Sequence, residues 1–353
     1  MVQNSSRDGR YSRLAALSVL TASAVTALAA CAPSPVTPTS DPGGSAPPRA
    51  TIEYRIATID GVGTPMNDGF DKFIEEVKQC SGGVLVGTNY PAGQLGGFTD
   101  LIDGNRNGTY EITSGGFDIE DRVSPVLAAL SLGFVFRDEA HVEAVIDSML
   151  PEMSAELEKT TGVAILGMGE DGWRWTFSSR PVATLSDLSG LKIRVPESEI
   201  PLRLWTELGA SPTPVPFTEI YNALETGVIE GGESALAQIK ANAFWEPAPY
   251  LNNTHHWFNI KPVRANAAWF NGLDADLQKC LLDAGDQVFD EVRKTSRAIE
   301  AATLEELQAQ GVTVLQQPSD LAEWEARAEI ANQAYFEQHP DAKTFIDKVK
   351  SLG

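Results

Sequence analysis

From Thr51 onward, short strand patterns alternate with helical patterns, and this alternation limits the possible folds more than any other feature of the chain. Residues 51–58 alternate apolar and polar side chains, as a strand does, and Phe70, Phe73 and Val77 then recur at helical spacing. Residues 83–90 and 110–113 predict two further strands, with a helix at about 98–105 between them. Strands alternating with helices favour an α/β fold with an open, mostly parallel sheet flanked by helices.

Sheets of this kind bind ligands at the carboxyl ends of their strands. Three glycine-containing loops follow predicted strands, at residues 60–67, 94–97 and 114–117. Asn67 and Ser114 are therefore candidate ligand contacts. None of the loops has the glycine spacing of a phosphate loop or a dinucleotide-binding turn, so we expect no nucleotide cofactor.

The length of the chain indicates its domain organisation, and its charge excludes some classes of partner. The 353 residues are enough for two lobes with separate cores. The net charge of −21 would repel nucleic acid and anionic lipid surfaces, so we expect neither as a partner.

The first fifty residues predict export and a membrane tether. Residues 1–30 hold three arginines, an uncharged stretch and a small-residue end, the layout of a secretory signal. The sequence LAAC at 28–31 resembles the bacterial lipobox, which predicts lipid modification of Cys31; the alternative is a plain secretory signal with an incidental cysteine. Residues 31–50, rich in Pro, Ser, Thr and Gly, predict a flexible linker. We expect an extracytoplasmic, lipid-anchored protein.

The remaining cysteines, Cys80 and Cys280, are an even pair outside the reducing cytosol. A disulfide and two buried free thiols both fit this pattern. We predict no metal site, because no His, Cys and Asp cluster has ligand spacing and the adjacent His255 and His256 would point to opposite faces of a strand.

Two arginines in the second half of the chain are candidate ligand contacts. Residues 192–195 predict a strand that stops at Pro196 and carries Arg194. A guanidinium offers a rigid fork of donors that matches the two oxygens of a carboxylate. Arg174 lies between two tryptophans, a pattern that also fits an arginine packed by its stem with its head in water. Phe217 stands at the start of a predicted helix, where it could stack on a ligand or close the core.

Several separated motifs carry a family resemblance. IRVPES at 193–198, LGASPTPVPFTEIYNALETGVIEGGES at 208–234, YPAGQLGG at 90–97 and WFNGLDADLQKCLLDAG at 269–285 resemble the solute-binding subunit of TRAP transporters, the DctP family. This resemblance implies two α/β lobes of the periplasmic-binding-protein type that close around a small organic acid, with no catalysis. It also implies delivery of that acid to separate membrane subunits of the transporter.

The resemblance also implies roles for particular residues. Arg194 matches the principal carboxylate-binding arginine of the family, Arg174 a second ligand-facing arginine, and Phe217 the aromatic residue that packs the ligand body. One of the two arginines could instead offset a nearby acid such as Glu233. The chain departs from the family at Ser234, where a hydroxyl replaces a common amide and offers fewer donors. The complete set of candidate ligand contacts is Arg194, Arg174, Phe217, Ser234, Glu233, Tyr221, Asn67, Ser114 and Trp173.

Residues 274–310 predict one long helix without proline, which the resemblance makes a brace for both lobes. We expect residues 51–171 and 260–299 to form the first lobe, and 172–259 and 300–353 the second, in a monomer. A lipoprotein serving an ABC importer or a sensor kinase is the alternative function. A secreted α/β hydrolase is disfavoured, because the chain has no GxSxG motif.

Overall fold

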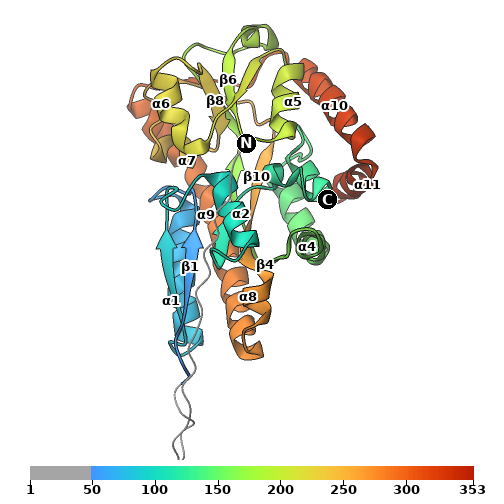
Figure 1. The fold of residues 1–353 in the computed structure, drawn as a ribbon. Helices are drawn as coiled ribbons and strands as arrows, with labels where there is room; N and C mark the ends of the chain where they lie inside the picture. Colours follow the sequence, from blue (N-terminus) through green and yellow to red (C-terminus); the bar gives the residue numbers. More distant parts are fainter. Residues whose placement is uncertain (1–48) are drawn as a thin grey trace, which may run out of the picture. The chain divides into compact units, whose positions relative to one another are not determined.

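The computed structural model describes residues 49–353, which fold around two β-sheets (Figure 1). The predicted signal segment 1–30, Cys31 and nearly all of the linker 31–50 lie outside the described residues and stay predictions. Within the described part, no helix is long and apolar enough to cross a membrane.

The first sheet has five strands, and its first three form the expected parallel unit. β1 pairs in parallel with both β2 and β3, whereas β10 is antiparallel to β3 and β4. The strand order is β2 (Leu85–Tyr90), β1 (Ile52–Ala57), β3 (Ile112–Ser114), β10 (Phe258–Asn266) and β4 (Val163–Trp173).

Helices flank this sheet because their apolar residues recur on one side. In α1 (Pro65–Cys80) the buried Phe70, Phe73 and Val77 face the core, and the Thr64 side chain caps the helix by accepting the Asn67 N–H. The other helical segments of this lobe are α2 (Phe98–Arg106), η1 (Phe117–Glu120), α3 (Pro125–Ala128), η2 (Ala129–Ser131), α4 (Glu139–Thr161) and α8 (Ala267–Asn271).

The second sheet has six strands and is also mixed. β6 is parallel to β7 and β8, β9 is parallel to β11, and β5 is antiparallel to β8 and β9. The order is β11 (Thr313–Leu315), β9 (Tyr250–Asn252), β5 (Trp175–Ser178), β8 (Gly231–Ser234), β6 (Lys192–Val195) and β7 (Ser211–Pro214). Its helical segments are η3 (Leu185–Leu188), α5 (Glu199–Glu207), η4 (Phe217–Glu219), α6 (Ile220–Glu225), α7 (Leu236–Ala241) and α10 (Leu321–Gln338).

Two segments cross between the lobes. β4 of the first sheet passes into β5 of the second with only Arg174 between them, and the chain returns from β9 to β10 through residues 253–257. The backbone N–H of Arg174 donates to the Trp257 carbonyl over 3.1 Å, so the two crossings are hydrogen-bonded to each other. Because the chain leaves the first sheet along one strand and re-enters along the next, β10 runs antiparallel to β4.

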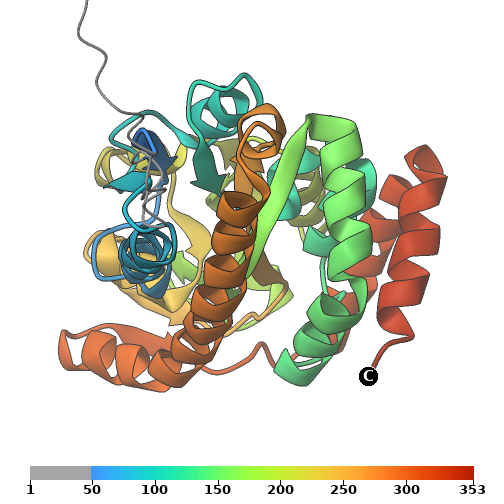
Figure 2. The same cartoon turned by 90° about the horizontal axis from the view of Figure 1, so that it is seen from below.

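The long helix α9 (Ala275–Ala309) matches the predicted helix closely and lies beside α1 and β4 (Figure 2). Gly167 in β4 and Gly285 in α9 permit this approach, since a Cβ on either would collide with the backbone of the other segment. Farther along, Arg297 forms a two-point ion pair with the buried Glu170. The helix also contacts α7 of the second lobe, as expected of a brace.

The last helix corrects one expectation. Residues 300–353 were placed in the second lobe, but Phe345, Ile346 and Val349 of α11 (Pro340–Lys350) join the core cluster that contains α3 and α4 of the first lobe. The apolar pattern of an amphipathic helix predicts which of its faces is buried, but not which neighbouring element covers that face. The predicted boundaries at 171/172 and 259/260 fall inside β4 and β10, two residues from the crossing segments.

Cys80 at the end of α1 and Cys280 in α9 are joined in a disulfide, with their Cα atoms 5.9 Å apart. The bond ties two helices whose cysteines are separated by 200 positions.

Replacing both cysteines by serine should lower the free energy of unfolding by about 2–4 kcal/mol, because the unfolded chain regains the freedom that the cross-link removes. Urea unfolding of the variant and of the wild-type protein, each with and without reductant, measures the effect. The reductant should shift the unfolding midpoint of the wild-type protein alone; equal midpoints for all four samples would contradict the prediction.

Candidate ligand-binding site

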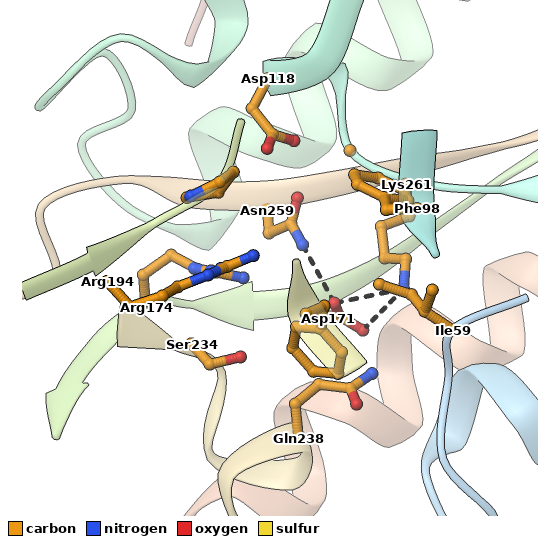
Figure 3. Close-up of a pocket in the computed structure, with 13 residues that line it drawn as sticks. Ile59, Phe98, Asp118, Asp171, Arg174, Arg194, Ser234, Gln238, Asn259 and Lys261 are labelled. Atoms are coloured by element: carbon orange, nitrogen blue, oxygen red, sulfur yellow. Dashed lines mark hydrogen bonds and ion pairs between the residues drawn. The ribbon is translucent and has the colours of Figure 1, made fainter. Parts of the chain in front are cut away.

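A cavity lies between the two sheets, with about 420 Å³ of space free of protein atoms, part of it open to solvent (Figure 3). Residues of both lobes line it, so the movement of one lobe relative to the other would open it. The lining residues are Ile59, Phe98, Gly116, Asp118, Asp171, Arg174, Arg194, Pro196, Phe217, Ser234, Gln238, Asn259 and Lys261.

Arg194 presents a buried guanidinium to the cavity from β6. Its Nε donates to the Val215 carbonyl over 2.8 Å, which fixes the plane of the group. Among the described residues, its two terminal nitrogens have no hydrogen-bond or ion-pair partner, although the residue is only 4% exposed. Burial lowers the pKa of Arg194 to about 10, with Glu233 opposing and Arg174 reinforcing the shift, so it stays charged at neutral pH.

Phe217 begins η4 and covers the arginine. The Arg194 guanidinium carbon lies 5.9 Å from the centre of the Phe217 ring, and Phe244 supports that ring in an edge-on contact. A ligand whose acid group binds Arg194 would therefore have an aromatic face beside its body.

Arg174 lines the same side of the cavity but is already paired. Its Nε donates to Glu233 Oε2 over 2.5 Å and one terminal nitrogen donates to the Glu233 carbonyl over 2.8 Å. Burial raises the pKa of Glu233, but the charge of Arg174 and its hydrogen bond to the carboxylate outweigh burial and lower the value to about 2. Glu233 is therefore an ionised partner behind Arg174, and only one terminal nitrogen of that arginine is left for a ligand.

Ser234, next in β8, points into the cavity. Its Oγ is buried and has no hydrogen-bond partner among the described residues. A hydroxyl in this state can both donate to and accept from a bound molecule.

The wall contributed by the first lobe holds two acids, an amide and a lysine (Figure 3). Lys261 forms ion pairs with Asp60 and, over 3.3 Å, with Asp171. Asn259 donates through Nδ2 to Asp171 over 3.0 Å, and its own Oδ1 is buried without a partner.

Asp118 stands apart on this wall. It is 4% exposed, and no other residue among those described donates to its carboxylate or forms an ion pair with it; its own backbone N–H is the one donor. Burial raises the pKa of Asp118 to about 6, helped by Glu233 and opposed by Arg174 and Arg194.

Comparison with known proteins identifies the family. Residues 56–339 match the bacterial extracellular solute-binding protein family 7, also named DctP. The chain belongs to this family.

Relatives and solved structures agree with that membership. The 2,3-diketo-L-gulonate-binding periplasmic protein YiaO of Escherichia coli (strain K12) is 32% identical over 246 residues, 69% of this chain and 75% of that protein. A TRAP periplasmic solute-binding protein of Roseobacter denitrificans with bound β-D-glucuronate has a TM-score of 0.82 at 28% identity, covering 86% of this chain and all of that one. The sugar-acid-binding protein of Advenella mimigardefordensis in complex with galactonate has a TM-score of 0.80 at 26% identity, covering 86% of this chain and 99% of that one.

Of the predicted contacts in this DctP protein, Arg194, Arg174, Phe217 and Ser234 line the cavity, whereas the other five do not. Glu233 does not line the cavity but forms an ion pair with Arg174, which does. Tyr221 donates to Glu246 over 2.9 Å, on the outer side of α6. Trp173 stacks on His255 with ring centres 5.2 Å apart, where the first crossing segment begins.

Asn67 and Ser114 lie in the expected loop regions but make local bonds. Asn67 is in the first turn of α1 and accepts from Asn89 over 3.0 Å, while Ser114 donates to Asp60 over 3.1 Å. Neither residue lines the cavity, because loop position alone does not determine where a side chain points, and their roles as ligand contacts stay predictions.

The polar residues of the first-lobe wall were not predicted from the sequence. Asp118 and Phe98 each lie one residue beyond a loop that was expected to border the cleft. Asn259 and Lys261 lie within β10, and polar side chains inside a fully buried strand were the signal that could have revealed them. Among the described residues, no group of three or more His, Cys, Asp or Glu side chains is placed to hold a metal.

The raised pKa of Asp118 gives a testable dependence of stability on pH. The protonated carboxyl stabilises the fold below about pH 4, and this stabilisation is lost as pH rises through about 6. Asp118→Asn removes the charge, so it should raise the free energy of unfolding of the ligand-free protein at pH 7.5 by about 1–3 kcal/mol.

Denaturant unfolding of this variant and the wild-type protein between pH 4 and 7.5 measures that difference. Asp103→Asn, an exposed change in the same lobe, serves as the control and should have the wild-type profile. A variant that is less stable than wild type at pH 7.5 would disprove the prediction.

Proposed function

We propose that this protein is the extracytoplasmic solute-binding subunit of a TRAP transporter and captures a small organic acid between its lobes. The observation that carries the proposal is the buried, charged Arg194, which has no acid partner among the described residues and faces the cavity. A ligand carboxylate would supply the missing negative charge and accept both terminal N–H groups.

Related proteins support a sugar acid as the ligand class. Their names and bound ligands include 2,3-diketo-L-gulonate, β-D-glucuronate and L-galactonate, each a carboxylate with several oxygen-bearing carbons. The polar groups distributed around this cavity fit such a molecule better than they fit a simple fatty acid.

The remaining parts of the proposal concern partners and location. Cys31 would anchor the protein to the membrane by lipid, and the protein would act as a monomer, without catalysis, delivering its ligand to the TRAP membrane subunits. An ABC importer or a sensor kinase is the alternative partner. Transport assays in cells expressing the TRAP membrane subunits, with and without this protein, distinguish these partners.

Replacement of Arg194 tests the proposed carboxylate contact. Arg194→Ala should weaken binding of an acid ligand by about 100-fold or more, because a desolvated charge pair loses one partner. Arg194→Lys should also bind poorly, since an ammonium lacks the planar fork.

Isothermal titration calorimetry with β-D-glucuronate and L-galactonate measures these affinities, after a thermal-shift screen of sugar acids has identified the tighter ligand. Lys192→Ala is the matched control, because Lys192 lies on the same strand and its side chain is exposed. Unchanged affinity in Arg194→Ala would remove Arg194 from the site.

A further inference from the structure

Two hydrogen-bond acceptors meet on the cavity wall opposite the arginines. A Cβ added at Gly116 would collide with Oδ1 of Asp118 and with Oδ1 of Asn259, so both oxygens lie against the same point of the backbone. The Asn259 oxygen is fully buried without a donor among the described residues, and the Asp118 carboxylate accepts only from its own backbone N–H. The Asn259 amide is held in this orientation because its Nδ2 donates to Asp171.

Adjacent buried acceptors without a donor are unfavourable. Either a proton on Asp118 or a hydrogen-bond donor from a bound molecule would remove this unfavourable arrangement. The charged groups that face Asp118 are Arg174, Arg194, Glu233 and Arg264, and burial outweighs the cations to raise the pKa of Asp118 to about 6. Near neutral pH the carboxylate is therefore mostly ionised and ready to accept a donor.

The other lobe fixes the backbone at this point. Ser198 Oγ of the second lobe donates to the Asp118 carbonyl over 2.5 Å, and the Glu199 N–H donates to Asp121 over 2.7 Å. Ser198 and Glu199 form the start of α5, whose cap residue makes no capping bond of its own. The two acceptors are therefore held in place when the lobes are together.

We propose that Asp118 and Asn259 form the acceptor half of the site, which binds a ligand hydroxyl and excludes a second carboxylate, so that the ligand is a hydroxylated monocarboxylate. The inference rests on the proposed function, because it takes the carboxylate on Arg194 as the other half of the recognition. Ser234 and Lys261 add donors nearby. A hydroxyl group both donates and accepts, and so can satisfy this mixed lining, whereas an ammonium group only donates.

Acids with one carbon skeleton provide the test. Galactarate is the dicarboxylate counterpart of both D-galactonate and D-galacturonate, and differs from each at one terminal carbon. Wild-type protein should bind one of these monocarboxylates at least about tenfold more tightly than galactarate in calorimetry at pH 7, because a second carboxylate would lie against two acceptors.

Asp118→Asn should weaken binding of the preferred monocarboxylate by about tenfold and reduce the difference from galactarate. The same substitution is expected to stabilise the ligand-free protein, so a loss of affinity could not be attributed to a loss of folding. Asp103→Asn should bind as wild type does.

Proton release gives a second measurement. A ligand hydroxyl that donates to the Asp118 carboxylate favours its ionised form, so binding near pH 6 should release protons and affinity should rise between pH 5 and pH 7. Titrations in two buffers of different ionisation enthalpy measure this release in the wild-type protein. In Asp118→Asn the release should be absent; the same release in both proteins would overturn the inference.

The remaining outcomes are distinguishable. Galactarate binding as tightly as the monocarboxylates, while Arg194→Ala still loses affinity, would overturn the acceptor half and leave the proposed function intact. D-Glucosaminate binding more tightly than D-gluconate would also overturn it, because an ammonium would then be the preferred donor. Failure of every sugar acid to bind would overturn this inference, and failure of all organic acids in the screen would overturn the proposed function as well.

Discussion

The site depends on the buried ion pair between Arg174 and Glu233. Arg174 is the single residue between the strands that cross from one lobe to the other, and its backbone also bonds the returning segment at Trp257. Removing one partner of a buried pair typically costs about 3–5 kcal/mol, so Glu233 is committed to Arg174. Arg194 lies near this acid but does not pair with it. The ion pair thus leaves one buried positive charge in the cavity for a ligand to neutralise.

The sequence predicted the elements of the fold better than their arrangement. The long helix was expected at 274–310 and is observed at Ala275–Ala309, because a proline-free amphipathic pattern of that length allows few other structures. The antiparallel direction of β10 and β5 was not predicted, since apolar periodicity does not record which way a strand runs. The position of α11 against the first lobe was missed for a related reason: its pattern defines a buried face but not the partner.

The residues of one cavity wall could be predicted from the sequence, whereas those of the other could not. The second-lobe wall comes mostly from one stretch of the chain, in which Arg194, Phe217 and Ser234 follow one another on successive elements. The family motif in this stretch identified all three as candidate contacts. The first-lobe wall is assembled from distant segments, with Asp118 after β3 and Asn259 in β10. Only the sheet order brings these two together. The rule that ligands bind at strand ends located the loop before Asp118 but not the residue that points inward.

Because Arg194 lies on the second lobe and the two acceptors on the first, closure of the lobes would also select among ligands. Arg194 can bind a carboxylate from the second lobe alone, so initial capture requires only one acidic group. In the proposed closed form, polar contacts between the lobes, such as that between Ser198 and the Asp118 carbonyl, would position the two acceptors against the ligand. A ligand without a donor would leave both acceptors buried and unsatisfied, and this penalty is larger than the net gain from a typical hydrogen bond. Discrimination would therefore come mainly from the failure of wrong ligands to stabilise the closed form, since a ligand shifts such an equilibrium only by its differential affinity for the two states.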